Sequence, residues 1–431
     1  MSLPRRDFIA STAGLAAVAL MPEFLAAAPR AAEPMGLAVI GAGRQGRAIM
    51  GELTKLDAAK VVVVCDNDAG RLRSGLGRAA GAAGVENYRE ALDRDDVKAV
   101  VVATPTHLHR QIAIDSLAAG KHVYCEAPLA STVEDTAAIA EAAGKAATTF
   151  ACGFEGRSNP VYRLARTFFR SDAVRALAAI RAQHMQKTSW RFPTSDPARE
   201  RAVNWRLDPA VSTGLAGELF SHQVDVARWY TGQEPEQVIG AGSIRLWDDG
   251  RRMPDTVDLV TTFAGGARML WLGSLASSYE GRHEVFFGEN ATIKLAWSHG
   301  WMFKEADAPT QGWEVYANRQ QFHNDEGITL IADATKLASQ GKLKEGIGLP
   351  NPSLYYALED FLRACLERTE PACPAAEGAK STLFGIKAHE AVMAVAGEGG
   401  GGGRGGEEGG YPPTRHSFPP PQTPLACPPP A

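Results

Sequence analysis

The stretch that decides the fold is Leu37-Ala38-Val39-Ile40-Gly41-Ala42-Gly43-Arg44-Gln45-Gly46. Four apolar residues lead directly into three glycines with the spacing GxGxxG, and a helical pattern follows. In such a unit the first glycine permits a tight turn, the second lets the backbone approach a diphosphate, and the third lets helix and strand pack closely. The N–H groups that open the helix attract phosphate. The pattern predicts that residues 41–46 bind a dinucleotide; the plainer interpretation is that these glycines serve turn geometry alone.

The residue that closes the second predicted strand supports the first interpretation. Asp66 follows the apolar run 61–64 and lies twenty positions after Gly46. A carboxylate at this place hydrogen-bonds the adenosine ribose hydroxyls and repels a 2′-phosphate, so NAD is favoured over NADP. Arg71 lies close enough in sequence to soften that preference.

Apolar runs alternate with helical stretches through the first part of the chain. After residues 37–40 and 61–64, further strands are predicted at 99–102, 122–125 and 149–152, and helices at 44–53, 109–119 and 133–143. Runs that are apolar throughout are typical of parallel strands covered on both faces. We therefore expect an α/β fold whose N-terminal domain, residues 35–152, is a doubly wound parallel sheet of the Rossmann type.

The pattern changes after residue 152. Residues 256–263 alternate apolar with polar or small side chains, turn at Gly265-Gly266 and continue over 268–272; a second hairpin joins 284–287 to 292–295. Such alternation predicts antiparallel strands with one buried face. We expect residues 153–397 to form an α+β domain with an open, largely antiparallel sheet. Two late helices, at 352–366 and 376–396, should pack back against the body.

The first thirty residues have the pattern of an export signal. Arg5-Arg6 precedes Phe8-Ile9, an apolar run over 10–21, and three alanines before Pro29. The run is too short to span a bilayer as a helix, which takes about 20 residues. The arginine pair resembles a bacterial twin-arginine signal. We predict a signal over residues 1–30 that engages the export machinery and places the mature protein in the periplasm; an uncleaved anchor or an ordinary secretory signal is the alternative.

The last segment, residues 398–431, has a different composition. Nine of the twelve residues at 399–410 are glycine, and nine of the twenty at 411–430 are proline. Such a segment buries too little apolar surface to offset the entropy of ordering it. We predict a disordered tail.

Charge and cysteine content exclude several classes. The chain has 45 Lys and Arg against 49 Asp and Glu, a net charge of −4, so it lacks the basic surface that a nucleic-acid partner requires. Its six cysteines form no CxxC pair, which disfavours zinc ribbons and thioredoxin chemistry. His107 and His109 lack an evident third ligand, so no metal site is expected. Cys365 and Cys373 are candidates for a disulfide in an oxidising compartment.

Four motifs in this order make the chain resemble the Gfo/Idh/MocA oxidoreductase family: residues 41–46, Cys65-Asp66, Ala-Thr-Pro-Thr-His-Leu-His at 103–109, and Gly-Lys-His-Val-Tyr-Cys-Glu-Ala-Pro at 120–128. The resemblance covers about residues 37–396. It implies a Rossmann domain followed by a substrate-binding domain whose open sheet forms homo-oligomers, and carbohydrate-like or polyol substrates. It also implies that Thr104, Pro105 and His109 lie beside the nicotinamide ribose and that Glu126 contacts the cofactor.

The chain departs from the family at one informative position. The usual Glu-Lys-Pro is here Glu126-Ala127-Pro128. In relatives that lysine hydrogen-bonds the reacting hydroxyl or carbonyl, whereas alanine supplies neither a donor nor a charge. Lys187 is a candidate replacement, and Trp205 is a candidate for stacking on a sugar ring.

A second family signature lies on a predicted helix over residues 217–225. Glu218, His222 and Asp225 are spaced i, i+4 and i+7, which places them on one helical stripe. Neutral histidine suits the proton released when an alcohol is oxidised, so His222 is the candidate base. Glu218 occupies the family's Asp position, and Asp225 is a candidate orienter. The alternative is a solvated polar face with Asp225 paired to Arg228.

Three functions follow from these residues. The first is an NAD(P)-dependent oxidoreductase acting on a secondary alcohol of a sugar or polyol. The second, suggested by Ala127 and the export signal, is a glycosidase or lyase that uses tightly bound NAD in a cycle of oxidation, elimination, hydration and reduction. The third is a non-catalytic nucleotide-binding protein.

Overall fold

The computed structural model describes residues 33–171, 173–194, 196–312, 314, 317–322, 325–332, 337, 339–340, 342, 347–398 and 416–417. The residues from Met35 onward form one compact unit; of the separate unit before it, only Glu33 and Pro34 are described. The predicted signal lies outside the described residues, as does the tail apart from Glu398 and the pair 416–417. None of the described helices is long and apolar enough to cross a membrane.

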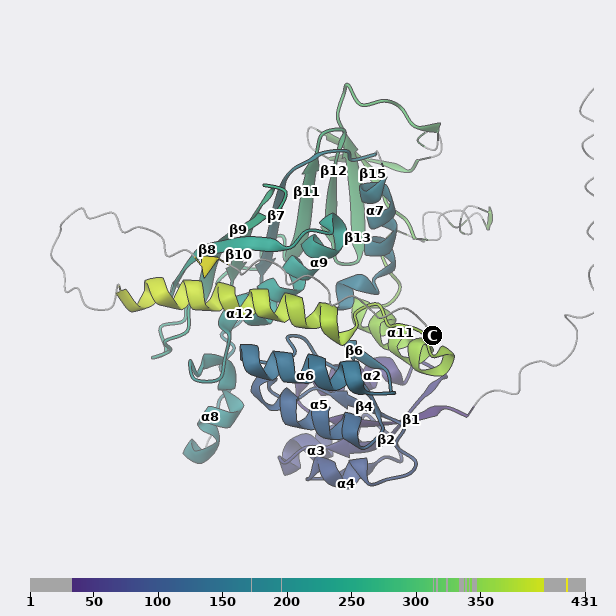
Figure 1. The fold of residues 1–431 in the computed structure, drawn as a ribbon, viewed down its shortest axis with the longest axis vertical. Coiled ribbons are helices and arrows are strands. Elements are labelled where there is room, and N and C mark those ends of the chain that lie inside the picture. Colours follow the sequence, from purple (N-terminus) through teal and green to yellow (C-terminus); the bar gives the residue numbers. More distant parts are fainter. Residues whose placement is uncertain are drawn as a thin grey trace, which may run out of the picture. The chain divides into compact units, whose positions relative to one another are not determined.

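The first sheet confirms the predicted α/β class. Its described strands are all parallel, in the order β3-β2-β1-β4-β5-β6 (Figure 1). The strands are β1 Met35–Ile40, β2 Ala59–Cys65, β3 Ala83–Val85, β4 Ala99–Val102, β5 His122–Cys125 and β6 Phe150–Cys152. The order reverses between β1 and β4, and ligands of such sheets bind at the carboxyl edge beside this switch point.

Helices flank this sheet: α2 Arg44–Leu53, α3 Ala69–Leu76, α4 Tyr88–Leu92, α5 His109–Ala118 and α6 Val133–Lys145. Local sequence sets their starts. The Asp68 side chain accepts the Arg71 N–H at the start of α3, and Thr132 accepts the Asp135 N–H at the start of α6. Helix α2 begins differently, after Gly43 and with no side-chain cap. Its first N–H groups are therefore left for a ligand.

The second sheet is largely antiparallel, as predicted. Among the described strands its order is β14-β15-β13-β12-β11-β7-β10-β9-β8-β16, and only β7 and β10 pair in parallel. The strands are β7 Leu177–Met185, β8 Pro235–Ser243, β9 Thr256–Phe263, β10 Arg268–Ser274, β11 Arg282–Gly288, β12 Ala291–Ala296, β13 His299–Lys304, β14 Arg319–Phe322, β15 Asp325–Thr329 and β16 His416–Ser417. Both predicted hairpins are present, as β9–β10 and β11–β12.

Short helices connect the two sheets and cover the second. They are α7 Pro160–Arg170, α8 Glu200–Val203, α9 Ser221–Thr231 and the 3₁₀ turns Thr106–Leu108, Glu155–Arg157, Pro197–Arg199 and Trp205–Leu207. A π-helical turn, Ala216–Phe220, leads directly into α9. Buried side chains of α7 and α9, including Tyr162 and Tyr230, share a core with Phe286 and Trp271 of the sheet.

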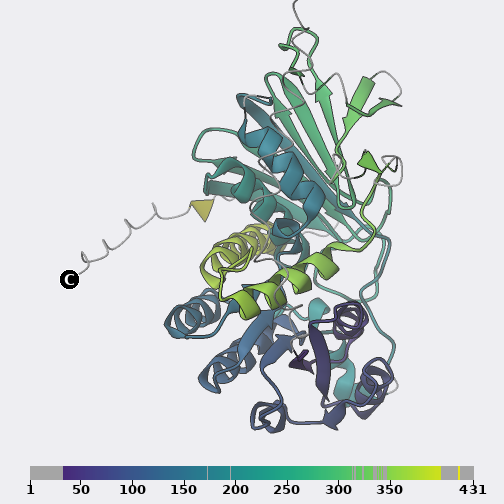
Figure 2. The ribbon, with the colours of Figure 1, turned by 90° about the vertical axis from the view of Figure 1, so that its right-hand side faces the viewer.

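The two late helices pack back as predicted. They are α11 Ser353–Glu367 and α12 Ala375–Glu398, yellow-green in Figures 1 and 2. Leu354 and Phe361 of α11 join Leu37 and Val39 of β1 in one buried cluster. Helix α12 packs against α6 of the first sheet and against β8 and α9 of the second. The chain's last helices therefore hold both sheets together.

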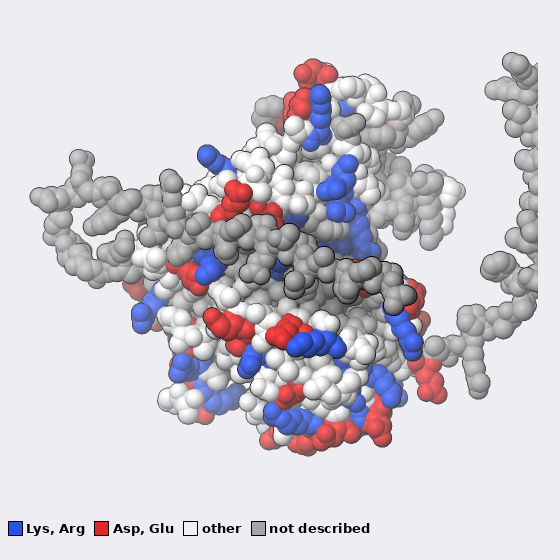
Figure 3. Space-filling view, in the orientation of Figure 1, with Lys and Arg blue, Asp and Glu red and all other residues white. Residues whose placement is uncertain are grey.

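The charged surface is mixed in sign. On the face shown in Figure 3, Lys and Arg side chains alternate with Asp and Glu over the elements of the first sheet. On the same face, Lys and Arg side chains gather over the region of α7.

Candidate active site

The glycine loop has the shape that a diphosphate requires. Gly41 has a φ of +96°, and a Cβ there would lie 2.5 Å from the Ala103 carbonyl oxygen. A Cβ at Gly46 would lie 1.8 Å from the Gly41 carbonyl oxygen. A Cβ at Gly43, in contrast, would meet nothing within 4 Å, so the backbone is open to a ligand there. The loop and the uncapped start of α2 therefore fit a dinucleotide.

Asp66 lies beside this loop, at the end of β2. One carboxylate oxygen accepts the Ala42 N–H at 2.8 Å and the other accepts the Asp68 N–H at 2.9 Å. The side chain is 8% exposed. Its carboxylate is thus fixed at the carboxyl edge of the sheet, where the sequence predicts the ribose contact. Arg199 pairs with Asp68 at the same edge.

The next predicted cofactor segment, residues 104–109, is fixed by a histidine. The His109 ring contacts the Thr104 carbonyl oxygen through Nε2 at 2.9 Å and the Pro128 carbonyl oxygen through Nδ1 at 3.1 Å. Burial lowers the pKa of His109 to about 4, so the ring is neutral and donates to one carbonyl at a time. His109 therefore holds the loop to the Ala127–Pro128 turn, while Thr104 and Pro105 remain partly exposed.

Glu126 follows β5 and connects its end to α2, the helix that begins at the glycine loop. Gln45 Nε2 donates to Glu126 Oε1 at 3.2 Å. Burial, and secondarily the charge of Glu155, raise the pKa of Glu126 to about 8. At neutral pH this side chain is thus an uncharged carboxylic acid that can donate as well as accept a hydrogen bond. The peptide bond from Ala127 to Pro128 is cis.

His222 lies against this turn. Burial lowers the pKa of His222 well below 6.5, with Arg282 and His184 lowering it further and the Ala127 backbone opposing them. Its Nδ1 is buried and has no hydrogen-bond partner among the described residues, and its ring packs edge-to-face on Phe154 with centroids 5.2 Å apart. A neutral imidazole whose Nδ1 has no hydrogen-bond partner among the described residues is able to accept a proton on that atom.

Glu218 and Asp225 have hydrogen-bond partners other than His222. Glu218 lies in the π-helical turn Ala216–Phe220, directly before α9, which carries His222. It accepts the Thr106 hydroxyl at 2.8 Å and Arg206 Nε at 3.0 Å. Glu218 therefore joins the loop at 104–109 to the segment around Trp205 and does not contact His222 Nδ1.

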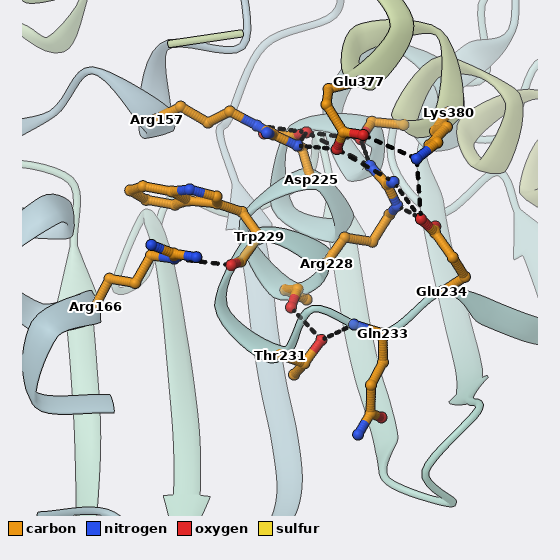
Figure 4. A network of polar contacts seen from close by, with 12 residues as sticks. Arg157, Arg166, Asp225, Arg228, Trp229, Thr231, Gln233, Glu234, Glu377 and Lys380 are labelled. Atoms are coloured by element: carbon orange, nitrogen blue, oxygen red, sulfur yellow. Dashed lines mark hydrogen bonds and ion pairs between the residues drawn. The ribbon is translucent and has the colours of Figure 1, made fainter. Parts of the chain in front are cut away.

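Asp225 also has other partners. It accepts three hydrogen bonds from Arg157 at 2.8–3.1 Å and one from the Ser381 hydroxyl at 2.7 Å. Figure 4 shows that Arg228, Glu377 and residues of α9 and α12 extend this network. Asp225 thus ties α9 to α12 and does not orient the His222 ring. The alternative pairing with Arg228 is present at 4.0 Å.

The structure adds residues that sequence spacing did not reveal. Arg282 and His184 pair in register across β11 and β7, and Glu155 lies in the turn after β6. Burial raises the pKa of Glu155 to about 7, and Arg282 lowers it again in part. Burial and Arg282 lower the pKa of His184 to about 3. No motif marks Arg282 or Glu155; Arg282 and His184 are brought together by the pairing of β11 with β7 in the second sheet.

Three lesser predictions have clear outcomes. Lys187 is exposed at the end of β7. Trp205 is buried, packs against His107 at 5.9 Å and carries the Arg206 guanidinium 4.4 Å from its centroid. Cys365 and Cys373 are free thiols, so the suggested disulfide is absent; Cys373 instead lies opposite Cys152, whose N–H donates to its carbonyl at 2.8 Å.

Comparison with known proteins places the chain in a family. Residues 35–154 match the family model "Oxidoreductase family, NAD-binding Rossmann fold", and residues 162–294 match the Gfo/Idh/MocA C-terminal domain. The chain therefore belongs to the Gfo/Idh/MocA oxidoreductase family, and its first domain is an NAD-binding Rossmann fold. This confirms the resemblance drawn from the four sequence motifs.

Individual relatives match only part of the chain. Levoglucosan dehydrogenase of Pseudarthrobacter phenanthrenivorans is 31% identical over 148 residues, 34% of this chain and 36% of the relative. A glycosyl hydrolase family 109 protein of Shewanella pealeana is 32% identical over 171 residues, 33% of this chain and 37% of the relative. The solved structure of levoglucosan dehydrogenase with NADH and levoglucosan shares the fold, with a TM-score of 0.67 and 21% identity over 85% of this chain and 98% of that one.

Proposed function

We propose that this chain is an NAD-dependent oxidoreductase that transfers hydride to or from a secondary alcohol carbon of a sugar- or polyol-like substrate. The observation that supports it most is the position of His222, which is neutral, lacks a partner on Nδ1 and lies against the turn after β5. The family's NAD-binding first domain and the sugar dehydrogenase among its relatives support the same proposal.

Each group has a defined task in this proposal. The loop at Gly43 and the start of α2 hold the diphosphate, and Asp66 holds the adenosine ribose. Bound NAD supplies the hydride acceptor. His222 takes the hydroxyl proton as the alcohol carbon is oxidised and returns it in the reverse reaction. Glu126 is in its neutral acid form, so the nicotinamide end of the site has no fixed negative charge from this residue. An ionised Glu126 would compete with His222 for the hydroxyl proton.

The test is NADH formation from a panel of aldoses and cyclitols. His222→Gln should lower kcat by about 10²- to 10⁴-fold and leave the Kd for NAD unchanged, because the side chain handles the proton and not the nucleotide. His122→Gln is the matched control, since His122 begins β5 at the opposite edge of the sheet. A His222→Gln enzyme with full kcat would remove His222 from the proposal.

Ala127 favours a second candidate function. Without the lysine, the site lacks a donor for the reacting oxygen that relatives use. In a redox-cycling glycosidase or lyase, oxidation of a sugar hydroxyl acidifies the neighbouring C–H, the glycosidic substituent leaves, water adds, and the hydride returns, so no net oxidation occurs. The partial similarity to a glycosyl hydrolase family 109 protein supports this candidate.

One experiment separates the two candidates. Protein purified with its nucleotide retained is incubated with aryl glycosides and, separately, with the free sugars. Release of the aglycone without accumulation of NADH selects the cycling enzyme. Stoichiometric NADH from a free sugar selects the dehydrogenase.

Export and self-association complete the proposal. The pair Arg5-Arg6 supports twin-arginine export to the periplasm, and the open second sheet supports homo-oligomers. A variant with both arginines changed to lysine should accumulate uncleaved in the cytoplasm. Light scattering on the purified protein reports its subunit number.

A further inference from the structure

Arg282 has an unused hydrogen-bonding edge at the candidate site. Its Nε and Nη2 atoms are buried and have no hydrogen-bond partner among the described residues. These two nitrogens share one side of the guanidinium, where their N–H bonds point in parallel. A side chain that is always charged and presents two parallel donors matches a carboxylate, which accepts one hydrogen bond on each oxygen.

The plane of this guanidinium is fixed. Its central carbon lies 3.5 Å from the centroid of the Trp297 ring. Trp297 is itself constrained: its φ is +59°, its carbonyl accepts Asn159 Nδ2 at 2.6 Å, and its ring packs edge-to-face on Tyr162 at 5.8 Å. The direction of the Nε–Nη2 edge is therefore set before any ligand arrives, which lowers the entropy lost on binding.

The neighbouring carboxyl group does not use this edge. Glu284 Oε1 lies 3.8 Å from Arg282 Nε, beyond hydrogen-bond distance. The two oxygens of Glu284 already accept Gln223 Nε2 at 2.9 Å and the Tyr162 hydroxyl at 2.5 Å. Glu284 thus belongs to the buried core network; it forms an ion pair with Arg282 but does not hydrogen-bond Nε or Nη2.

Arg282 is also close to the reacting groups. It begins β11 and pairs in register with His184 on β7, and its charge acts on both Glu155 and His222. The side chain retains 15% of its surface exposed, at atoms other than the buried Nε and Nη2. A substrate whose hydroxyl meets His222 therefore has a positive, two-donor group within the same site.

We propose that Arg282 binds a carboxylate of the substrate, so that the enzyme acts on acidic sugars such as hexuronates in preference to neutral ones. This inference rests on the proposed function at the same site. It assigns to Arg282 a part in substrate selection, with the hydride transfer and proton transfer left to NAD and His222.

The test compares matched sugars on wild type and variants. The probes are glucuronate, galacturonate and mannuronate, each beside its uncharged methyl ester, with glucose 6-phosphate as a second anion. We measure NADH formation and, independently of turnover, the shift in melting temperature that each sugar causes in the NAD-loaded protein. Arg282→Gln removes the charge and the parallel pair of donors, and Arg282→Lys keeps the charge without the planar, paired geometry. Arg181→Gln, an exposed arginine on β7, is the matched control.

With the wild-type enzyme, kcat/KM for at least one hexuronate should be at least 10-fold higher than kcat/KM for its methyl ester. Arg282→Gln should lower kcat/KM for that acid by about 10- to 100-fold and for the ester by less than about 3-fold, with Arg282→Lys in between. Equal use of acid and ester, equal losses on both, or preference for the phosphate would overturn the inference. If the inference fails in this way but neutral sugars still yield NADH, the proposed function is retained. If no sugar yields NADH but the acids alone raise the melting temperature, and Arg282→Gln abolishes that rise, the inference about Arg282 is upheld and the proposed function is not.

Discussion

At the scale of single residues, one positive charge acts on the candidate base His222. Ala127 contributes none, and Arg282 contributes one from the second sheet. Burial lowers the pKa of His222 and of His184, and the charge of Arg282 lowers both further. These imidazoles are therefore neutral under ordinary conditions, which a proton acceptor requires. The same burial raises the pKa of Glu126 and Glu155, so the site is less charged than its composition suggests.

The raised carboxyl pKa values predict how stability depends on pH. The pKa is about 8 for Glu126 and about 7 for Glu155 in the folded protein, against an ordinary value of 4.5. Between these limits the two folded carboxyl groups hold protons that the unfolded chain has released, so their contribution to the free energy of unfolding falls as pH rises from about 4.5 to about 8. Glu126→Gln cannot ionise and should match wild type near pH 5 but melt on the order of 2–5 °C higher near pH 8.5.

Thermal melts across this pH range check the prediction. Glu141→Gln is the control, because Glu141 lies on the exposed face of α6, paired with Lys145, and its pKa is lowered. It should give no advantage that grows with pH. If Glu126→Gln melted at the same offset from wild type at every pH, the raised pKa of Glu126 would be refuted.

At the scale of elements, the sequence predicted the helix and the loop whose conformations are set by neighbouring residues. Helix α2 begins at Arg44 and ends at Leu53, as expected, and the glycine loop has the predicted conformation. The short strand β3, Ala83–Val85, was missed because its three residues are only partly buried and carry no apolar run. The π-helical turn before α9 was not predicted, because the spacing of Glu218, His222 and Asp225 fits an uninterrupted α-helix equally well.

Two glycines of α2 give a paired prediction. Gly46→Ala would place a Cβ 1.8 Å from the Gly41 carbonyl oxygen, so the loop must move. We expect NAD affinity to fall by at least about 100-fold, because the phosphate-binding N–H groups leave their positions. Gly51→Ala, in the same helix, meets nothing within 4 Å and should stabilise the protein by about 0.5–1 kcal/mol.

Calorimetric titration with NAD and urea unfolding separate the two effects. Gly51→Ala should bind NAD with wild-type affinity. Normal NAD binding by a folded Gly46→Ala protein would mean that the close approach of helix and strand is not needed for the nucleotide site.

At the scale of the whole molecule, the two sheets are joined by contacts that no local pattern encodes. Arg157 follows β6, Asp225 lies on α9, and Glu377 lies near the start of α12, yet the three form one ion-pair network (Figure 4). Leu129 and Thr382 add a hydrogen bond between the first sheet's domain and α12 at 3.0 Å. The sequence separation of these partners explains why Asp225 was interpreted as part of the catalytic set.

Asp225 therefore tests whether this network serves stability or chemistry. Asp225→Asn leaves the buried Arg157 charge without its main partner, and losing one member of a buried pair costs about 3–5 kcal/mol. The free energy of unfolding should fall by that amount, while kcat per folded molecule and the pH profile stay within about 3-fold of wild type, because His222 Nδ1 does not contact Asp225. Glu289→Gln, which breaks the exposed pair with Arg175, is the control and should cost less than about 1 kcal/mol. A stable Asp225→Asn protein with a large loss of kcat would instead return Asp225 to the reacting groups.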